Sequence, residues 1–134
     1  MNATSPIEAE KACLLFGNTR IRAFSTDQEE LGGIRNKDNV AYKYLDFGEG
    51  VHEFEIRVAP GMKRGSIHLT LDQPWHPAIG KVEIKPGNGE KDWQTFSCKV
   101  KKTSGVHALW LRFSGETDTD LFDVDWFKFS SSTP

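Results

Sequence analysis

The 134-residue chain has no hydrophobic run that approaches the roughly 20 residues needed to cross a bilayer, so we expect no membrane partner. It has no excess of basic residues either. Its 17 Lys and Arg against 19 Asp and Glu give a formal net charge of −2, which argues against nucleic acid as a partner, because such proteins usually present a basic face. No segment keeps a helical period, so helices are expected to contribute little to the fold.

Cysteine is scarce and the usual catalytic motifs are missing. The two cysteines, Cys13 and Cys98, allow one disulfide bond, and the sequence does not decide whether it forms. The four histidines lack metal-ligand spacing, and there is no serine-centred elbow or glycine-rich phosphate loop. Asp123 and Asp125 are two residues apart on one expected strand, so they would lie nearly parallel rather than across a substrate. We therefore expect a protein that is not an enzyme.

What is present fits one ordinary globular domain, with 37% hydrophobic and 27% charged residues. We assign residues 1–134 to a single module, with residues 1–5 as a polar leader and residues 130–134 as a linker remnant. The start, 1–6, is too short and polar for a secretory signal. The chain is thus expected to be cytosolic or a piece of a larger secreted protein, and the linker-like end favours the second.

Strand-like alternation recurs between turn signals, which is typical of a two-layer β protein. The fold class we predict is all-β, a β-sandwich with jelly-roll topology. The segments 25–30 and 73–80 are expected to be loops. The expected strands are 7–10, 14–16, 20–24, 40–47, 52–58, 66–72, 81–85, 94–101, 106–113 and 121–129.

The last expected strand, 121–129, is apolar on both of its alternating sets, so we predict that both of its faces are covered. Strict alternation puts Asp123 and Asp125 on the same face as Phe127. Buried carboxylates are costly without a partner, so this strand calls for a bound cation, a ligand, or exposure of its end.

Three acids form one candidate site. Glu8 and Glu10 share one side of the first expected strand, and Asp125 lies on the last. First and last strands often meet at one edge of a sandwich, where three carboxylates could share a calcium ion. The alternative, favoured by spacing alone, is that the glutamates are solvated edge residues.

Two tryptophans form a second candidate site. Trp75 and Trp93 stand in loops or at strand ends, where an indole can stack on a sugar ring. The alternative for each is that it covers the core beneath its loop. Trp110, in the middle of a strand between two leucines, is expected to serve packing rather than recognition.

Ordered motifs along nearly the whole chain resemble the family 6 carbohydrate-binding modules. They are 7–10 (IEAE), 38–42, 45–48 (LDFG), 92–96 (DWQTF), 105–109 (GVHAL) and 123–127 (DVDWF). Each motif is weak alone, and the ordered set is specific.

The resemblance implies a β-jelly-roll that binds polysaccharide and is appended to a secreted glycoside hydrolase, hence an extracellular location. It implies a structural calcium at Glu8, Glu10 and Asp125. It also implies a sugar cleft at one rim, where an aromatic side chain and a tryptophan sandwich a sugar ring and an asparagine binds its hydroxyls. Trp93 matches that tryptophan.

The chain departs from the family pattern at three of the sugar-binding positions. Gly33 stands at the position of the second aromatic and Asp123 at that of the asparagine, although a carboxylate still accepts strong hydrogen bonds. Asn39 stands where some members have a tryptophan for a second site on the concave sheet face. Trp75 is one side chain that could supply the missing wall, and Asn36 is a further candidate ligand-binding residue.

We therefore expect a monomeric, non-catalytic module that binds xylan, arabinoxylan or β-glucan through Trp93 and Asp123. Two alternatives remain open. One is a domain of the same fold that has lost sugar binding and serves a structural or protein-interaction role. The other is a small polysaccharide-degrading enzyme.

Overall fold

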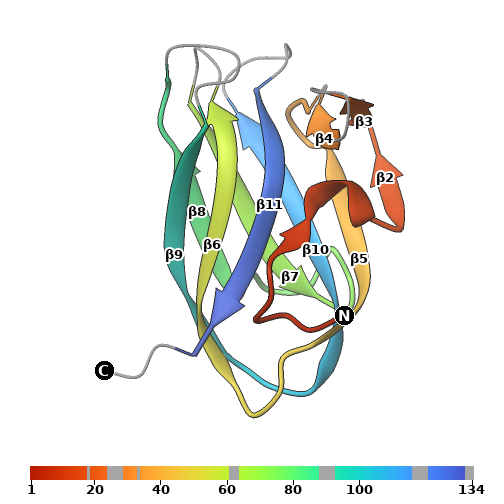
Figure 1. The fold of residues 1–134 in the computed structure, drawn as a ribbon, viewed down its shortest axis with the longest axis vertical. Coiled ribbons are helices and arrows are strands. Elements are labelled where there is room, and N and C mark those ends of the chain that lie inside the picture. The colour runs from red at the N-terminus through yellow and green to blue at the C-terminus, as the bar shows by residue number, and fades with distance from the viewer. Residues whose placement is uncertain are drawn as a thin grey trace.

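The computed structural model describes residues 1–17, 19–23, 29–32, 34–60, 64–87, 93–115 and 121–131. Most of these residues belong to strands of two sheets that pack face to face (Figure 1). The elements are β1 (Ile7–Glu8), the 3-10 helix η1 (Ala9–Lys11), β2 (Leu14–Phe16), β3 (Arg20–Ala23), β4 (Glu29–Gly32), β5 (Asn39–Asp46), β6 (Val51–Pro60), β7 (Gly65–Leu71), β8 (Gly80–Ile84), β9 (Gln94–Thr103), β10 (Val106–Gly115) and β11 (Phe122–Ser130).

The six-stranded sheet, called the first sheet below, has the order β3-β4-β11-β6-β9, and β1 also pairs with β11. The five-stranded second sheet has the order β2-β5-β10-β7-β8. From β5 to β11 the chain changes sheet at every connection except β7 to β8, which is typical of a jelly roll. The predicted all-β sandwich is confirmed.

Two local predictions were wrong. The segment 7–10 does not continue as a strand, because after Glu8 the backbone turns into η1. Residues Glu29 and Glu30, predicted to lie in a loop, belong to β4, which pairs with β3 and with Val124 of β11. The ladder supplies partners for the backbone of β4, so a polar sequence without alternation can still form a strand.

The core lies between the two sheets and is rich in aromatic rings. Tyr42 of the second sheet meets Phe127 of the first edge to face at 4.8 Å, and Phe47 meets Phe129 at 5.0 Å. Cys98 packs against this core as predicted, and burial raises the pKa of its thiol, as expected for a small buried hydrophobe. Cys13 and Cys98 are both free thiols.

The predicted faces of β11 were wrong because the strand contains a β-bulge. Val124 pairs with Val58 and Trp126 with Arg57, two consecutive residues of β6, so Asp125 is an extra residue. The buried positions are accordingly Phe122, Val124, Phe127 and Phe129. Asp123, Asp125, Trp126 and Lys128 are half-buried on the outer face, so β11 is covered on one face only.

The two ends of the sandwich differ in what they carry. At one end, called the rim end, β6 leads into β7 and β10 leads into β11. At the other, called the opposite end, β5 leads into β6 and β9 leads into β10. The rim end is at the top of Figure 1, and the N-terminus and the end of β11 lie in its lower half. In the described part of the chain, no helix has the length and apolar character that a membrane span requires.

Candidate functional site

Trp93 stands at the rim end, one residue before β9. Gln94 pairs with Val58, which places Trp93 beside Ala59 of β6. Because Ile56 and Val58 point into the core, Ala59 and Arg57 point to the outer face of the first sheet. The indole is half-buried and contacts Arg57, so it lies on this outer face and not in the core.

Asp123 lies on the other side of Ala59. It pairs with Ala59 across the β11–β6 ladder. Trp93, Ala59 and Asp123 thus form one row across three strands, and the usual strand spacing puts the Cα atoms of Trp93 and Asp123 about 10 Å apart. Ala59 is 3% exposed although it faces outward, as expected when larger side chains flank it. The structure therefore brings the two principal candidates for sugar binding together at the rim.

Arg57 is part of this group, although no motif in the sequence singles it out. The carbon at the centre of its guanidinium lies over the Trp93 ring, 5.1 Å from the ring centroid. Its Nη1 also donates to Asp125 Oδ2 at 2.5 Å. Alternation along β6 already indicates that Arg57 faces outward. Its partners depend on the register with β9 and β11, which alternation does not give.

Leu31 and Ile34, the described residues on either side of position 33, lie at the same end. Leu31 pairs with Val124, and the carbonyl of Ile34 accepts the N–H of Leu121. Gly33 itself, the predicted site of the second aromatic wall, lies outside the described residues. Asn36 is also at the rim end, where its side-chain oxygen accepts the N–H of Gly115 at 3.2 Å.

Trp75 does not join the rim. Its loop follows the end of β7, at the opposite end of the sandwich, so it cannot supply the second wall of a cleft around Trp93. The indole is 73% exposed, which also contradicts the alternative that it covers the core.

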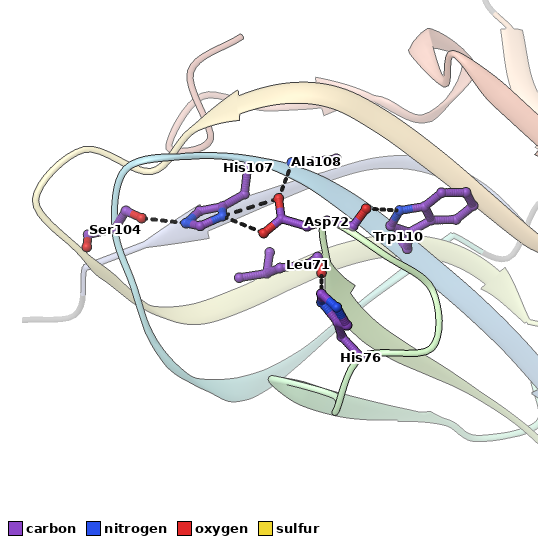
Figure 2. A network of polar contacts seen from close by, with 7 residues as sticks. All are labelled: Leu71, Asp72, His76, Ser104, His107, Ala108 and Trp110. Carbon is purple, nitrogen blue, oxygen red and sulfur yellow. Dashed lines mark hydrogen bonds and ion pairs between the residues drawn. The ribbon is translucent and has the colours of Figure 1, made fainter.

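The loop of Trp75 is held by the polar network in Figure 2. The Asp72 carboxylate lies 3.0 Å from His107 Nδ1 and accepts the N–H of Ala108 at 3.3 Å. The indole N–H of Trp110 donates to the Asp72 carbonyl at 3.2 Å. Trp110 is 7% exposed, so its predicted packing role is confirmed with a hydrogen bond added.

The three predicted calcium ligands are only partly described. Glu8 pairs with Trp126, next to Asp125, and its side chain is exposed. The hydroxyl of Tyr42 donates to the carbonyl of Ala9 at 2.7 Å, which anchors η1 to the core. The side chain of Glu10 lies outside the described part. Among the described side chains there is no group of three or more His, Cys, Asp or Glu that could hold a metal ion.

Asn39 begins β5 on the outer face of the second sheet, away from Trp93. The described residues predicted for sugar binding therefore lie in three places. Trp93, Asp123 and Asn36 are at the rim end, Asn39 is on the outer face of the second sheet, and Trp75 is at the opposite end. The rim row offers what a sugar needs, an aromatic ring next to a charged hydrogen-bond acceptor.

Comparison with known proteins identifies a family of carbohydrate-binding modules. The family described as "Carbohydrate binding module (family 6)" matches residues 8–131. A relative, endo-1,4-beta-xylanase A of Thermoclostridium stercorarium, is 31% identical over 134 residues, which are 99% of this chain and 25% of the enzyme. The chain therefore spans about a quarter of that relative's length.

Solved structures agree with this match. A family 6 carbohydrate-binding module from Clostridium cellulolyticum in complex with xylose superposes with a TM-score of 0.90 at 31% identity, covering 97% of this chain and 99% of that one. A β-1,3-glucan-binding module from Bacillus halodurans superposes with a TM-score of 0.87 at 28% identity, covering 96% and 97%.

Proposed function

The chain belongs to the family 6 carbohydrate-binding modules, and from this we propose that it is a non-catalytic module that binds a plant cell-wall polysaccharide. Xylan or arabinoxylan is the first choice and β-glucan the second. A xylanase relative and a xylose-bound module at 31% identity support the first, and a β-1,3-glucan-binding module at 28% supports the second.

The observation that carries the proposal is the rim row. Trp93 presents an aromatic ring on the outer face, held from one side by Arg57, and Asp123 stands two strands away in the same row. In the proposed complex a sugar ring stacks on the indole while the carboxylate accepts its hydroxyl protons. Because the site is built on β-strands, binding should cost conformational entropy mainly in the ligand and little in the protein.

The Trp93→Ala variant tests this assignment, with Trp75→Ala as a matched control. Both remove an indole from the surface, but only one removes it from the rim. We expect Trp93→Ala to weaken binding by about tenfold or more, as for an aromatic residue at the centre of an interface. Trp75→Ala should bind like the parent. Affinity gels containing arabinoxylan, glucuronoxylan or a mixed-linkage β-glucan measure both variants and identify the preferred polysaccharide.

Equal retardation of the parent and Trp93→Ala would remove the rim assignment. If the parent itself is not retarded by any of these polysaccharides, the chain has the fold without the function. A structural or protein-interaction role would then be the better account. Release of reducing ends from the same polysaccharides would instead show an enzyme.

We also propose that Glu8, Glu10 and Asp125 hold a structural calcium ion. Backbone pairing puts Glu8 opposite Trp126, the residue after Asp125, on a segment anchored by Tyr42. Asp125 uses Oδ2 for Arg57, and its Oδ1 makes no hydrogen bond to another described residue. Carboxylate oxygens are suitable ligands for calcium. The ion would tie the N-terminal segment to β11.

Calcium titration tests that site. An ion that binds only the folded state raises the melting temperature in proportion to the logarithm of its concentration above Kd, and a chelator reverses the shift. Asp125→Asn should reduce this stabilisation. Glu53→Gln, which changes an acid elsewhere on the same outer face, should leave it intact. A melting temperature that does not respond to calcium or chelator would exclude the ion.

The proposed partners are the polysaccharide and a glycoside hydrolase module in the same parent chain, in an extracellular setting. The support is that relatives such as the xylanase are enzymes of which a region like this chain forms about a quarter.

A further inference from the structure

The segment before β1 carries a short motif that the sugar-binding proposal does not use. Asn2-Ala3-Thr4 is the only place in the sequence where an asparagine is followed two positions later by serine or threonine. This is the acceptor pattern for N-linked glycosylation, in which an oligosaccharide is transferred to the asparagine side chain. A three-residue pattern is weak by itself, so the surroundings of Asn2 in the fold decide whether it can carry a glycan.

The backbone of this segment is fixed, and the two motif side chains turn outward. The N–H of Ala3 donates to the Asp46 carbonyl at 3.0 Å, and the carbonyl of Ala3 accepts the N–H of Phe129 at 2.9 Å. Ala3 is fully buried, whereas Asn2 and Thr4 on either side of it are exposed. A glycan on Asn2 would therefore project into solvent without disturbing a buried contact.

The Asn2 and Thr4 side chains are joined by local hydrogen bonds. Asn2 Oδ1 accepts the Thr4 hydroxyl at 2.7 Å and the Thr4 N–H at 2.9 Å. Because these bonds join residues two positions apart, they do not need the rest of the fold and are available to a chain that is still unfolded during secretion. In the part of the chain that the structure describes, Asn2 Nδ2 donates no hydrogen bond, so the nitrogen that would carry the sugar is not otherwise engaged.

These hydrogen bonds favour the chemistry of transfer. An amide nitrogen is a weak nucleophile, because its lone pair is delocalised into the carbonyl group. Loss of one Nδ2 proton gives an anion whose charge lies mainly on Oδ1, and hydrogen bonds to a charged oxygen are stronger than those to a neutral one. The Thr4 hydroxyl and N–H therefore stabilise the anionic form, in which Nδ2 can attack a sugar carbon.

The space beside Asn2 is large enough for a sugar. An open hollow of about 500 Å³ is lined by residues that include Asn2, Thr4, Asp46, Glu49 and Ser131. This hollow is at the opposite end of the sandwich, where β5 leads into β6. A glycan there would lie far from the rim row and leave it accessible.

We propose that Asn2 is an N-glycosylation site that receives an oligosaccharide from a lipid-linked diphosphate donor. A bond forms between Nδ2 and C1 of the first sugar, the bond between C1 and the diphosphate oxygen breaks, and the lipid diphosphate leaves with that electron pair. The Nδ2 proton passes to a base of the transferase, and nothing is oxidised or reduced. Such transferases act in the secretory route, which agrees with the proposed extracellular setting.

Secretion of the full chain from a eukaryotic host tests the site, with a cleavable leader placed ahead of Met1. The mass of the secreted protein should exceed the sequence mass by that of an N-linked oligosaccharide, and an N-glycosidase should remove the excess. Asn2→Gln and Thr4→Val should carry no glycan, whereas Thr4→Ser should still be modified because it keeps the hydroxyl. Ser5→Ala is the matched control, since it removes the neighbouring exposed hydroxyl and should leave the glycan in place.

Binding gives a second readout, of where the glycan lies. The glycosylated protein and the N-glycosidase-treated protein should bind soluble xylan with affinities within about twofold of each other. The inference is overturned if the secreted parent carries no mass that the N-glycosidase removes, if Asn2→Gln retains that mass, or if the glycan weakens binding by about tenfold or more. The proposal does not depend on sugar binding at the rim, because the mass of the secreted protein is measured independently of it.

Discussion

At the scale of single residues, Arg57 contacts residues of both proposed sites near the rim. Its guanidinium contacts the Trp93 ring and donates to Asp125, so it links the proposed stacking residue to a proposed calcium ligand. Its side chain is 37% exposed and that of Asp125 is 16% exposed, so solvent screens the pair and its contribution to stability is modest. We expect its larger role to be fixing the orientation of the indole.

Replacing Arg57 with Met keeps most of the side-chain volume and removes both polar contacts. We expect a loss of about 1 kcal/mol in the free energy of unfolding, because Asp125 keeps a half-buried charge without its partner. Polysaccharide affinity should also fall, since the indole is no longer held. Urea unfolding and affinity gels measure the two effects.

The control for Arg57 is the ion pair between Lys99 and Glu53 on the same face, in which Lys99 is 85% exposed. Lys99→Met should change stability by less than about 0.5 kcal/mol and leave binding unchanged. If Arg57→Met binds the polysaccharide as well as the parent does, the guanidinium does not position the indole.

At the scale of elements, the bulge in β11 decides which residues reach the surface. Without the extra residue Asp125, Trp126 would follow Val124 directly, and the ladder to Val58 and Arg57 would be continuous. The bulge therefore places an additional carboxylate on the outer face while Phe127 and Phe129 remain in the core.

Two single-residue deletions in β11 should differ sharply. Deleting Asp125 removes the bulge and preserves every buried position, so we expect a folded protein that loses less than about 2 kcal/mol, together with any response to calcium. Deleting Lys128 moves Phe129 to the outer face, which should cost about 3–5 kcal/mol, as for loss of a buried aromatic ring.

Chemical unfolding of both deletion variants gives the comparison. Equal destabilisation by the two deletions would mean that the bulge is needed for the fold itself, and not only for the position of the Asp125 carboxylate.

At the scale of the whole molecule, the proposed rim site lies far from the described chain ends. The rim row is at one end of the sandwich, and a groove lined by Asn39, His68 and Arg112 opens on the outer face of the second sheet near the same end. Both termini of the described chain lie at the opposite end (Figure 1). A neighbouring module attached there would leave the rim and the groove accessible.

A globular protein fused after Pro134 should therefore leave affinity for xylan within about twofold of that of the isolated chain, because a twofold change is only about 0.4 kcal/mol. Calorimetry with soluble xylan compares the fusion with the isolated chain. A large loss of affinity in the fusion would show that the ligand reaches the opposite end, where Trp75 is exposed.

The sequence alone determined the class of fold and most strand positions, because alternation of apolar residues reports burial on one face of a sheet. It also indicated Trp93 and Asp123 as candidate binding residues, because an indole at a strand end and a carboxylate in an apolar strand are both unusual locally. Prediction from the sequence failed where strand pairing overrides the local pattern. The extra residue in β11 puts Asp123 and Phe127 on opposite faces, whereas strict alternation predicts the same face. Pairing with β3 and β11 makes Glu29–Gly32 a strand, whereas its polar sequence predicts a loop.

Only the tertiary structure decided which residues share a site. Trp75 and Trp93 look alike in the sequence, yet they lie at opposite ends, because the direction of each strand decides where its flanking loop goes. Arg57 reaches Trp93, and Arg112 stands beside His68, through the register between strands far apart in the chain. Cross-strand register comes from packing of the two sheets, which a local sequence pattern does not contain.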